Sequence, residues 1–255
     1  MQLKKPKFWD KKKPNLISNL LLPFTSIIKL NNLFQSFALP KKSNLIKSIC
    51  VGNIYLGGTG KTPTTIKLFK ILEKLKIKVA VGKKFYPSQK DEIIILKNHT
   101  NLIISNNRKN IIKKAKELKQ EMVVFDDGLQ DNSVYHDIKI VCFDYQNWIG
   151  NGLLIPAGPL REKLDSLKKY DCVFLKDADS NKIDIVTKEI KKINRNIKIF
   201  CTYFEISNLN QINKFNKIII FSGIGNPNNF KRILQKNNFN IIEEIIYPDH
   251  YDYKK

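Results

Sequence analysis

Short apolar runs alternate along the chain with longer stretches in which apolar residues recur every three or four positions. The short runs predict strands at 49–51, 78–81, 91–96, 102–104, 121–127, 138–144, 172–176, 197–204 and 217–221. The longer stretches predict helices at 61–75, 108–119, 185–193 and 228–235. This alternation predicts an α/β fold built on a mostly parallel sheet with flanking helices.

The run at 121–127 predicts a buried strand that ends in acidic residues. Four consecutive apolar residues, which begin at Met122, suit a strand covered on both faces of a parallel sheet. The run ends in Asp126 and Asp127, and parallel sheets bind their ligands at the carboxyl ends of strands. A solvated Asp-Asp-Gly turn is the alternative interpretation.

An amphipathic segment precedes the first strand. Its apolar positions follow helical spacing at Ile17, Leu20, Leu21, Phe24, Ile27, Ile28, Phe34 and Phe37. Pro23 should kink or split this helix. The segment is either a core-packing helix or a helix that lies in a membrane interface, and the flanking lysines favour the interface. Its longest unbroken apolar run, 20–24, is too short to span a bilayer.

Composition adds a basic surface. The net charge is +22 over 255 residues, which suits contact with phosphates or an anionic membrane. Only four of the basic residues are arginines, the side chains that read base edges best, so no nucleic-acid partner is expected. The four cysteines are far apart with no C-x-x-C pair, and we expect reduced core cysteines of a cytoplasmic protein.

A glycine-rich loop between the first strand and its helix carries the main chemical signal. The residues expected to bind a nucleotide phosphate are Gly57, Gly58, Thr59, Gly60, Lys61, Thr62 and Pro63. Glycines let backbone N–H groups approach an anion, the lysine reaches the outer phosphates, and the threonine hydroxyl ligates Mg²⁺. Tyr55 and Leu56 depart from the usual P-loop spacings, and a plain glycine turn is the alternative interpretation.

Acidic residues complete the expected metal site. Asp126 or Asp127 should hold Mg²⁺ opposite Thr62, as an acidic residue at a strand end does in P-loop enzymes. The segment 150–162 is too rich in glycine and proline to be regular and too apolar to be a solvated linker. We expect it to form an ordered loop near the site, from which Glu162 contributes to the metal.

These segments, in this order, resemble the tetraacyldisaccharide 4'-kinases of lipid A biosynthesis. The resemblance rests on the stretches 8–9, 51–53, 57–63, 126–130, 154–162, 223–227 and 247–250. Two of them are far more specific than any P-loop, namely Pro-Ala-Gly-Pro-Leu-Arg-Glu at 156–162 and Pro-Asp-His at 248–250.

The resemblance implies a kinase that uses ATP and Mg²⁺. Its substrate is the 4'-hydroxyl of a tetraacylated glucosamine disaccharide 1-phosphate, at the inner face of the cytoplasmic membrane, and its amino-terminal helix is membrane-associated. It also implies that Asp91, paired with His250, activates the sugar hydroxyl, and that Lys61 acts on the phosphates. The expected domains are a membrane-associated segment at 1–44, a kinase core at 45–206 and the start of a carboxyl-terminal lobe at 207–255.

Three departures from the family pattern stand out. The family's Ser-Arg-Gly-Tyr is replaced near 82–86, and Asp131 stands where the family has histidine. The family also continues into a second lobe with a Thr-Glu-Lys-Asp stretch, so we expect a fragment with an incomplete lobe. Two other classes of function stay open: a deviant P-loop ATPase, which predicts lysine at position 56, and a lipid- or nucleic-acid-binding module with a vestigial P-loop.

Overall fold

The computed structural model describes residues 5–37, 42, 46–178, 183–206, 209, 217–224, 227–248, 251 and 253. Its contacts divide the chain into two units. The larger unit spans Lys7–Thr202, and the smaller contains Tyr203–Lys255 with Met1–Pro6. The domain boundaries expected after 44 and 206 stay a prediction.

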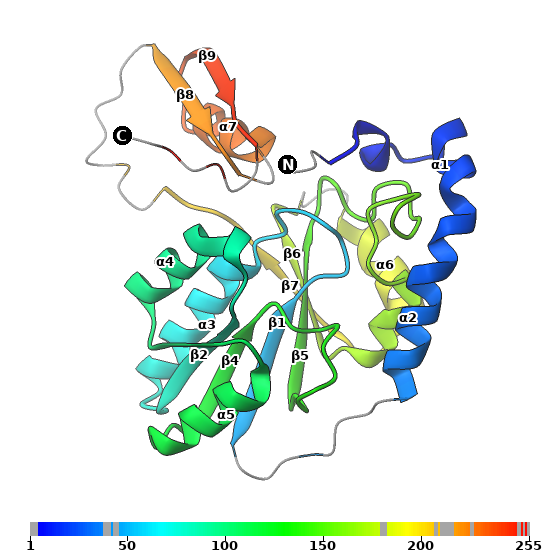
Figure 1. Cartoon of the computed structure of the whole chain (residues 1–255). Helices are drawn as coiled ribbons and strands as arrows, with labels where there is room; N and C mark the ends of the chain where they lie inside the picture. Colours follow the sequence, from blue (N-terminus) through cyan, green and yellow to red (C-terminus); the bar gives the residue numbers. More distant parts are fainter. Residues whose placement is uncertain are drawn as a thin grey trace. The chain divides into compact units, whose positions relative to one another are not determined.

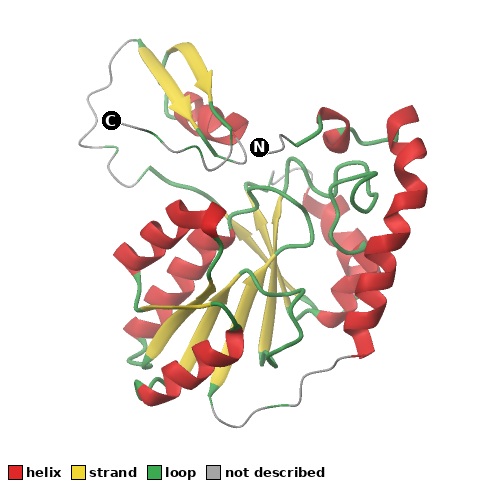
Figure 2. Cartoon of the chain, in the orientation of Figure 1, coloured by secondary structure: helices red, strands yellow, loops and turns green. Residues whose placement is uncertain are grey.

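A parallel sheet forms the centre of the larger unit (Figures 1 and 2). Its strands are β1 Lys47–Gly52, β2 Val79–Lys84, β3 Leu102–Ser105, β4 Met122–Asp126, β5 Ile138–Asp144, β6 Cys172–Lys176 and β7 Lys198–Thr202. They lie in the order β3-β2-β4-β1-β5-β6-β7, and every neighbouring pair is parallel. The α/β fold with a parallel sheet is therefore confirmed.

Helices cover both faces of this sheet. The α-helices of the larger unit are α1 Leu16–Leu21, α2 Thr25–Phe37, α3 Lys61–Lys74, α4 Lys90–His99, α5 Arg108–Glu117 and α6 Ile183–Ile193. Short 3₁₀ helices lie at Lys7–Asp10, Leu22–Phe24, Pro87–Gln89 and Leu164–Lys169. Helices α3 and α4 share one apolar core with the sheet through Phe69 and Leu96, whereas α5 and α6 share the other through Ile111 and Ile190.

The central strand β1 sets where the site lies. Its residues from Ser48 to Gly52 are buried, because β4 and β5 flank it and both faces are covered. The glycine loop leaves its carboxyl end, and Asp126 ends the neighbouring strand β4. Side chains from both strands therefore meet at one edge of the sheet, as the sequence predicts.

The smaller unit contains one β-α-β element, formed by β8 Ile218–Ser222, α7 Pro227–Lys236 and β9 Ile241–Ile246. The two strands are parallel, which requires the crossover that α7 provides. Strand β8 and helix α7 lie where the sequence predicts them. The Pro-Asp-His stretch falls partly outside the described residues, because Asp249 and His250 are not among them.

Two sequence-based expectations are wrong. The run at 91–96 is part of helix α4 and forms no strand. In the helix, Leu96 is the buried residue of the run, and Asp91 and Glu92 lie in the first turn, where negative charge interacts favourably with the helix dipole. The four cysteines are free, but only Cys50 and Cys142 are buried. Cys201 is exposed because β7 is an edge strand.

The amino-terminal helix is split at Pro23, as the sequence predicts. Helix α1 ends at Leu21, a 3₁₀ turn that contains Pro23 follows, and α2 begins at Thr25. None of the helices within the described ranges combines the length and hydropathy that a membrane crossing requires.

A buried histidine should make folding stability depend on pH. His136 is 4% exposed and packs against Phe125, and its Nε2 has no partner among the described residues. Burial, with the charges of Arg108 and Lys139, lowers the pKa of His136 from 6.5 to about 4. Between these two pH values His136 binds a proton in the unfolded chain but not in the folded chain. Its contribution to the free energy of unfolding is therefore fully present above about pH 6.5 and is lost as the pH falls towards 4.

We expect a loss of about 2–3 kcal/mol in the free energy of unfolding between pH 7 and pH 4 from this group alone. Urea denaturation of the wild type and His136→Gln across this range measures it, and the variant should lose less stability on acidification. His99→Gln, at an exposed position, is the control. Parallel pH curves for wild type and His136→Gln would contradict the assignment.

Candidate active site

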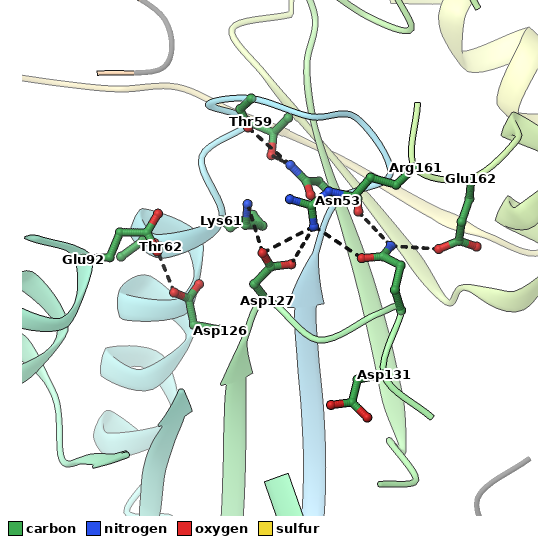
Figure 3. A network of polar contacts seen from close by, with 12 residues as sticks. Asn53, Thr59, Lys61, Thr62, Glu92, Asp126, Asp127, Asp131, Arg161 and Glu162 are labelled. Atoms are coloured by element: carbon green, nitrogen blue, oxygen red, sulfur yellow. Dashed lines mark hydrogen bonds and ion pairs between the residues drawn. The ribbon is translucent and has the colours of Figure 1, made fainter. Parts of the chain in front are cut away.

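The glycine loop after β1 has the backbone geometry of an anion cradle (Figure 3). Gly57 has φ of +144° and Gly60 has φ of +83°, conformations that side chains with a Cβ rarely adopt. The buried Asn53 amide braces the loop from inside, since its Nδ2 donates to Gly57 O at 3.3 Å and to Thr59 Oγ1 at 3.0 Å. The Asn53 side chain therefore stabilises the conformation of this loop.

Helix α3 begins directly at the end of this loop. Gly60 is its N-cap, so the N–H groups of Lys61 and Thr62 lie in the first turn, where an α-helix has no acceptors of its own. The positive end of the helix dipole adds to this field. The arrangement suits a phosphate group at the amino end of α3.

Asp126 lies next to Thr62, as the sequence predicts. Its Oδ2 accepts a hydrogen bond from Thr62 Oγ1 at 3.2 Å, and its Oδ1 accepts one from Thr65 Oγ1 at 3.3 Å. Carboxylate and hydroxyl oxygens are the hard ligands that Mg²⁺ prefers. Thr62 and Asp126 therefore fit the expected metal.

Asp126 also contacts a lysine that the sequence analysis missed. Lys83 is 1% exposed, and its Nζ lies 2.7 Å from Asp126 Oδ2 and 2.5 Å from Glu92 Oε2. Burial disfavours the charged ammonium, but Asp126 and Glu92 outweigh it and raise the pKa of Lys83. The signal in the sequence is a lysine that directly follows the buried run Val79–Gly82.

Asp127 faces a second group of cations. Lys61 Nζ lies 3.6 Å from its carboxylate, and Arg161 Nη1 lies 3.3 Å from Oδ1 (Figure 3). Burial opposes the charge of this carboxylate, but Lys61 and Arg161 prevail and hold the pKa of Asp127 below its ordinary value. Asp127 therefore stays ionised beside the P-loop lysine.

The backbone at Asp127 adopts a left-handed conformation, with φ of +58°. Two interactions hold it: its N–H donates to Val51 O, and Arg108 Nη2 donates to its carbonyl oxygen. Arg108 is 4% exposed and its Nη1 pairs with Asp131. Asp131, where the family pattern has histidine, thus orients the arginine that holds the Asp127 turn.

The loop that contains residues 154–162 packs directly on the glycine loop. Leu56 N–H donates to Pro159 O at 2.8 Å, and Arg161 N–H donates to Ile54 O at 2.7 Å. An isolated bridge joins Tyr55 and Leu160. The expectation of an ordered loop near the site is confirmed.

Glu162 lies on the far side of Arg161 from Asp126 (Figure 3). Its Oε1 accepts hydrogen bonds from Gln130 Nε2 and Tyr170 Oη, each at 2.8 Å. Gln130 in turn accepts from Arg161 at 3.4 Å. The structure therefore joins Glu162 to Asp127 through Gln130 and Arg161, and its expected place at the metal stays a prediction.

The two residues expected to activate the acceptor hydroxyl have different outcomes. Asp91 lies in the exposed first turn of α4, and its neighbour Glu92 reaches the site through Lys83. His250 lies outside the described residues. The pairing of Asp91 with His250 therefore stays a prediction.

A second buried lysine on the other flank of the glycine loop was also missed. Lys176, at the end of β6, donates to Gly58 O at 3.3 Å and pairs with Asp144 at 2.7 Å. Lys83, Arg108 and Lys176 are therefore three buried cations, each paired with a carboxylate. Within the described residues, no three acidic, histidine or cysteine side chains form a metal cluster.

The family model and the curated relatives that match this chain carry the same name. The sequence profile of the family described as "LpxK: Tetraacyldisaccharide-1-P 4'-kinase" matches residues 16–255. The chain is 46% identical over 256 residues to a protein named tetraacyldisaccharide 4'-kinase from Pelagibacter ubique, covering 100% of this chain and 81% of the relative. A protein of the same name from Rickettsia akari is 37% identical, with 97% of this chain and 79% of the relative covered.

A solved structure shares the fold. LpxK from Aquifex aeolicus, described in complex with ATP, superposes with a TM-score of 0.71 at 22% identity, covering 94% of this chain and 85% of that chain. At this identity the similarity concerns the fold alone.

The Arg108 contacts should be measurable in stability. Arg108→Lys keeps the charge but loses the planar group that reaches Asp131 and the Asp127 carbonyl together. We expect a loss of about 1–3 kcal/mol in the free energy of unfolding, because charged hydrogen bonds in a buried position are broken. Chemical denaturation measures it, with Arg195→Lys at an exposed position as control. Equal stabilities of the two variants would contradict the assigned role.

Proposed function

The chain belongs to the tetraacyldisaccharide-1-P 4'-kinase family, and from this membership we propose that it phosphorylates a lipid A precursor. The γ-phosphate of ATP is transferred to the 4'-hydroxyl of a tetraacylated glucosamine disaccharide 1-phosphate. The observation that carries the proposal is the meeting of Lys61 and Thr62, at the start of α3, with Asp126 and Asp127 at the end of β4.

The proposed nucleotide site uses residues 57–63. Backbone N–H groups of the loop and the first turn of α3 bind the phosphates, and Lys61 contacts the outer ones. Phosphoryl transfer depends on positioning and on stabilising charge that spreads over the phosphoryl oxygens. Because Asp127 holds Lys61 at 3.6 Å and Arg161 lies on the same carboxylate, two cations are oriented before the nucleotide arrives.

Mg²⁺ would be held by Thr62 and Asp126, with Asp127 close by. The ion would supply charge neutralisation between the phosphates of ATP. Glu162 remains a proposed contributor, although its carboxylate is engaged by Gln130 and Tyr170.

The proposed base is Asp91 together with His250. A sugar hydroxyl is a weak nucleophile near neutral pH, and a positioned base contributes about 10²–10⁴-fold to rate. A carboxylate paired with imidazole would orient the ring and raise its proton affinity. Support for Asp91 comes from its place in the turn of α4 that Glu92 and Lys83 attach to the site.

The amino-terminal helices support an interfacial role, because their polarity is reversed. Among the side chains that the structure describes in α1 and α2, the buried ones are the polar Ser18 and Thr25, spaced seven positions apart. Asn32, seven positions further on, donates to Arg161 O at 3.0 Å. Eight apolar residues of the segment are at least 50% exposed, namely Leu16, Ile17, Leu20, Phe24, Ile27, Leu30, Leu33 and Phe34.

An exposed apolar stripe beside a basic segment suits the interface of an anionic membrane. We therefore propose peripheral attachment to the inner leaflet of the cytoplasmic membrane, where the lipid substrate resides. The domain scheme that follows has a membrane-associated segment at 1–44, a kinase core at 45–206 and the start of a second lobe at 207–255.

Replacing the P-loop lysine should distinguish a kinase from a binding module with a vestigial P-loop. We expect Lys61→Ala to slow lipid phosphorylation by about 10²-fold or more, since the charge that stabilises the transferring phosphoryl group is lost. Labelled ATP with the lipid precursor measures the rate, and Lys70→Ala, exposed on the same helix, is the control. Near-normal turnover by Lys61→Ala would exclude the proposed P-loop role, and lipid-independent ATP hydrolysis would favour the ATPase alternative.

Membrane attachment should depend on the apolar stripe. The triple variant Leu20→Gln, Ile27→Gln, Phe34→Gln should lose most vesicle binding, because it removes exposed apolar side chains. Flotation with anionic and neutral vesicles measures binding, and high salt should weaken it. The matched control replaces exposed apolar residues elsewhere by glutamine, namely Ile71, Leu75 and Leu118. Equal flotation of both triple variants would contradict the attachment.

A further inference from the structure

Lys83 is a buried charge for which neither the P-loop nor the proposed base gives a reason. It lies at the carboxyl end of β2, beside Asp126 in the register of the β2–β4 pair. Its side chain is 1% exposed, and lysine is almost never buried to this extent without ionic partners. Lys84, the next residue of the strand, is half-buried, and its Nζ lies over the Tyr86 ring.

The Lys83 ammonium joins two elements that belong to different parts of the site. On one side it lies 2.7 Å from Asp126 Oδ2, the same oxygen that accepts from Thr62. On the other side it lies 2.5 Å from Glu92 Oε2, in the first turn of α4. A continuous series of contacts therefore runs from Thr62 through Asp126 and Lys83 to Glu92.

The contacts in this series restrain two groups, the Asp126 carboxylate and the first turn of α4. The Asp126 side chain ends a strand, and three donors fix its carboxylate: Thr62, Thr65 and Lys83. The first turn of α4 follows the short 3₁₀ helix Pro87–Gln89 and has no side-chain cap hydrogen bond at Gln89. Glu92 attaches this turn to the end of β2 through its ion pair with Lys83.

We propose that Lys83 is a positioning residue for phosphoryl transfer. Its ammonium holds the Asp126 carboxylate beside Thr62 and fixes the first turn of α4 through Glu92. The metal-binding side of the site and the turn that contains Asp91 are thereby held in one arrangement. The catalytic part of this inference rests on the proposed function, whereas the attachment of α4 does not.

Three variants of the full chain test the inference. Lys83→Met keeps the length of the side chain and removes the charge, Lys83→Arg restores a cation, and Lys84→Met is the matched control on the same strand. Hydrogen exchange over 87–99 reports the attachment of α4. Calorimetry of ATP binding at several Mg²⁺ concentrations reports Asp126, and lipid phosphorylation gives kcat and KM.

For Lys83→Met we expect exchange in the first turn of α4 to rise about tenfold or more, as a local attachment is lost. The Mg²⁺ concentration needed for ATP binding should also rise about tenfold, and kcat should fall more than KM for the lipid changes. Lys83→Arg should recover part of each effect, and Lys84→Met should match wild type. A Lys83→Met protein with wild-type exchange and Mg²⁺ requirement would overturn the inference, as would equal losses in Lys84→Met.

A fourth variant keeps the test decisive if Lys83→Met does not fold. Glu92→Gln leaves the Lys83–Asp126 pair intact and changes a side chain that is 20% exposed. It should raise exchange in the first turn of α4 while the Mg²⁺ requirement stays near wild type. Unchanged exchange would refute the attachment. If wild type itself transfers no phosphate to lipid, the proposed function fails, but the exchange and Mg²⁺ results still decide the role of Lys83.

Discussion

Charge compensation around two adjacent carboxylates is the constraint on which the site depends. Asp126 and Asp127 lie side by side at the carboxyl end of the buried strand β4. Two neighbouring carboxylates repel each other unless cations separate them. The fold separates their partners: Asp126 faces Lys83 and the hydroxyls of α3, whereas Asp127 faces Lys61 and Arg161. Each carboxylate thereby orients groups that a phosphate or a metal ion can use.

Hydrogen bonds of buried polar groups also link the amino-terminal segment to the site. Ser18 accepts from Asn151, and Trp9 donates to Pro156 O, so hydrogen bonds join the amino-terminal segment to the 150–162 loop. Arg161 connects helix α2 to the site, because its carbonyl oxygen accepts a hydrogen bond from Asn32 and its guanidinium contacts Asp127. The polar residues of the segment thus contact the rest of the protein, whereas many of its apolar residues are exposed.

Sequence reasoning predicts those features that local pattern determines. The parallel sheet follows from continuous apolar runs, the split at Pro23 from its missing N–H, and the P-loop from glycines before Lys61. It fails at 91–96, where four apolar residues in a row suit either a strand or a helix and only tertiary contacts decide. Lys83, Arg108 and Lys176 were missed because their role arises from carboxylates distant in sequence, at Asp126, Asp131 and Asp144.

The central claim is that this carboxyl-edge site transfers phosphate to the 4'-hydroxyl of the lipid. The most direct test incubates the chain with Mg-ATP and the tetraacylated disaccharide 1-phosphate, and then locates the new phosphate by phosphorus–proton correlation spectroscopy and mass spectrometry. The account predicts one added phosphate, as a monoester coupled to the proton on carbon 4'. A diphosphate at position 1, or ATP consumed with no phosphorylated lipid, would contradict it.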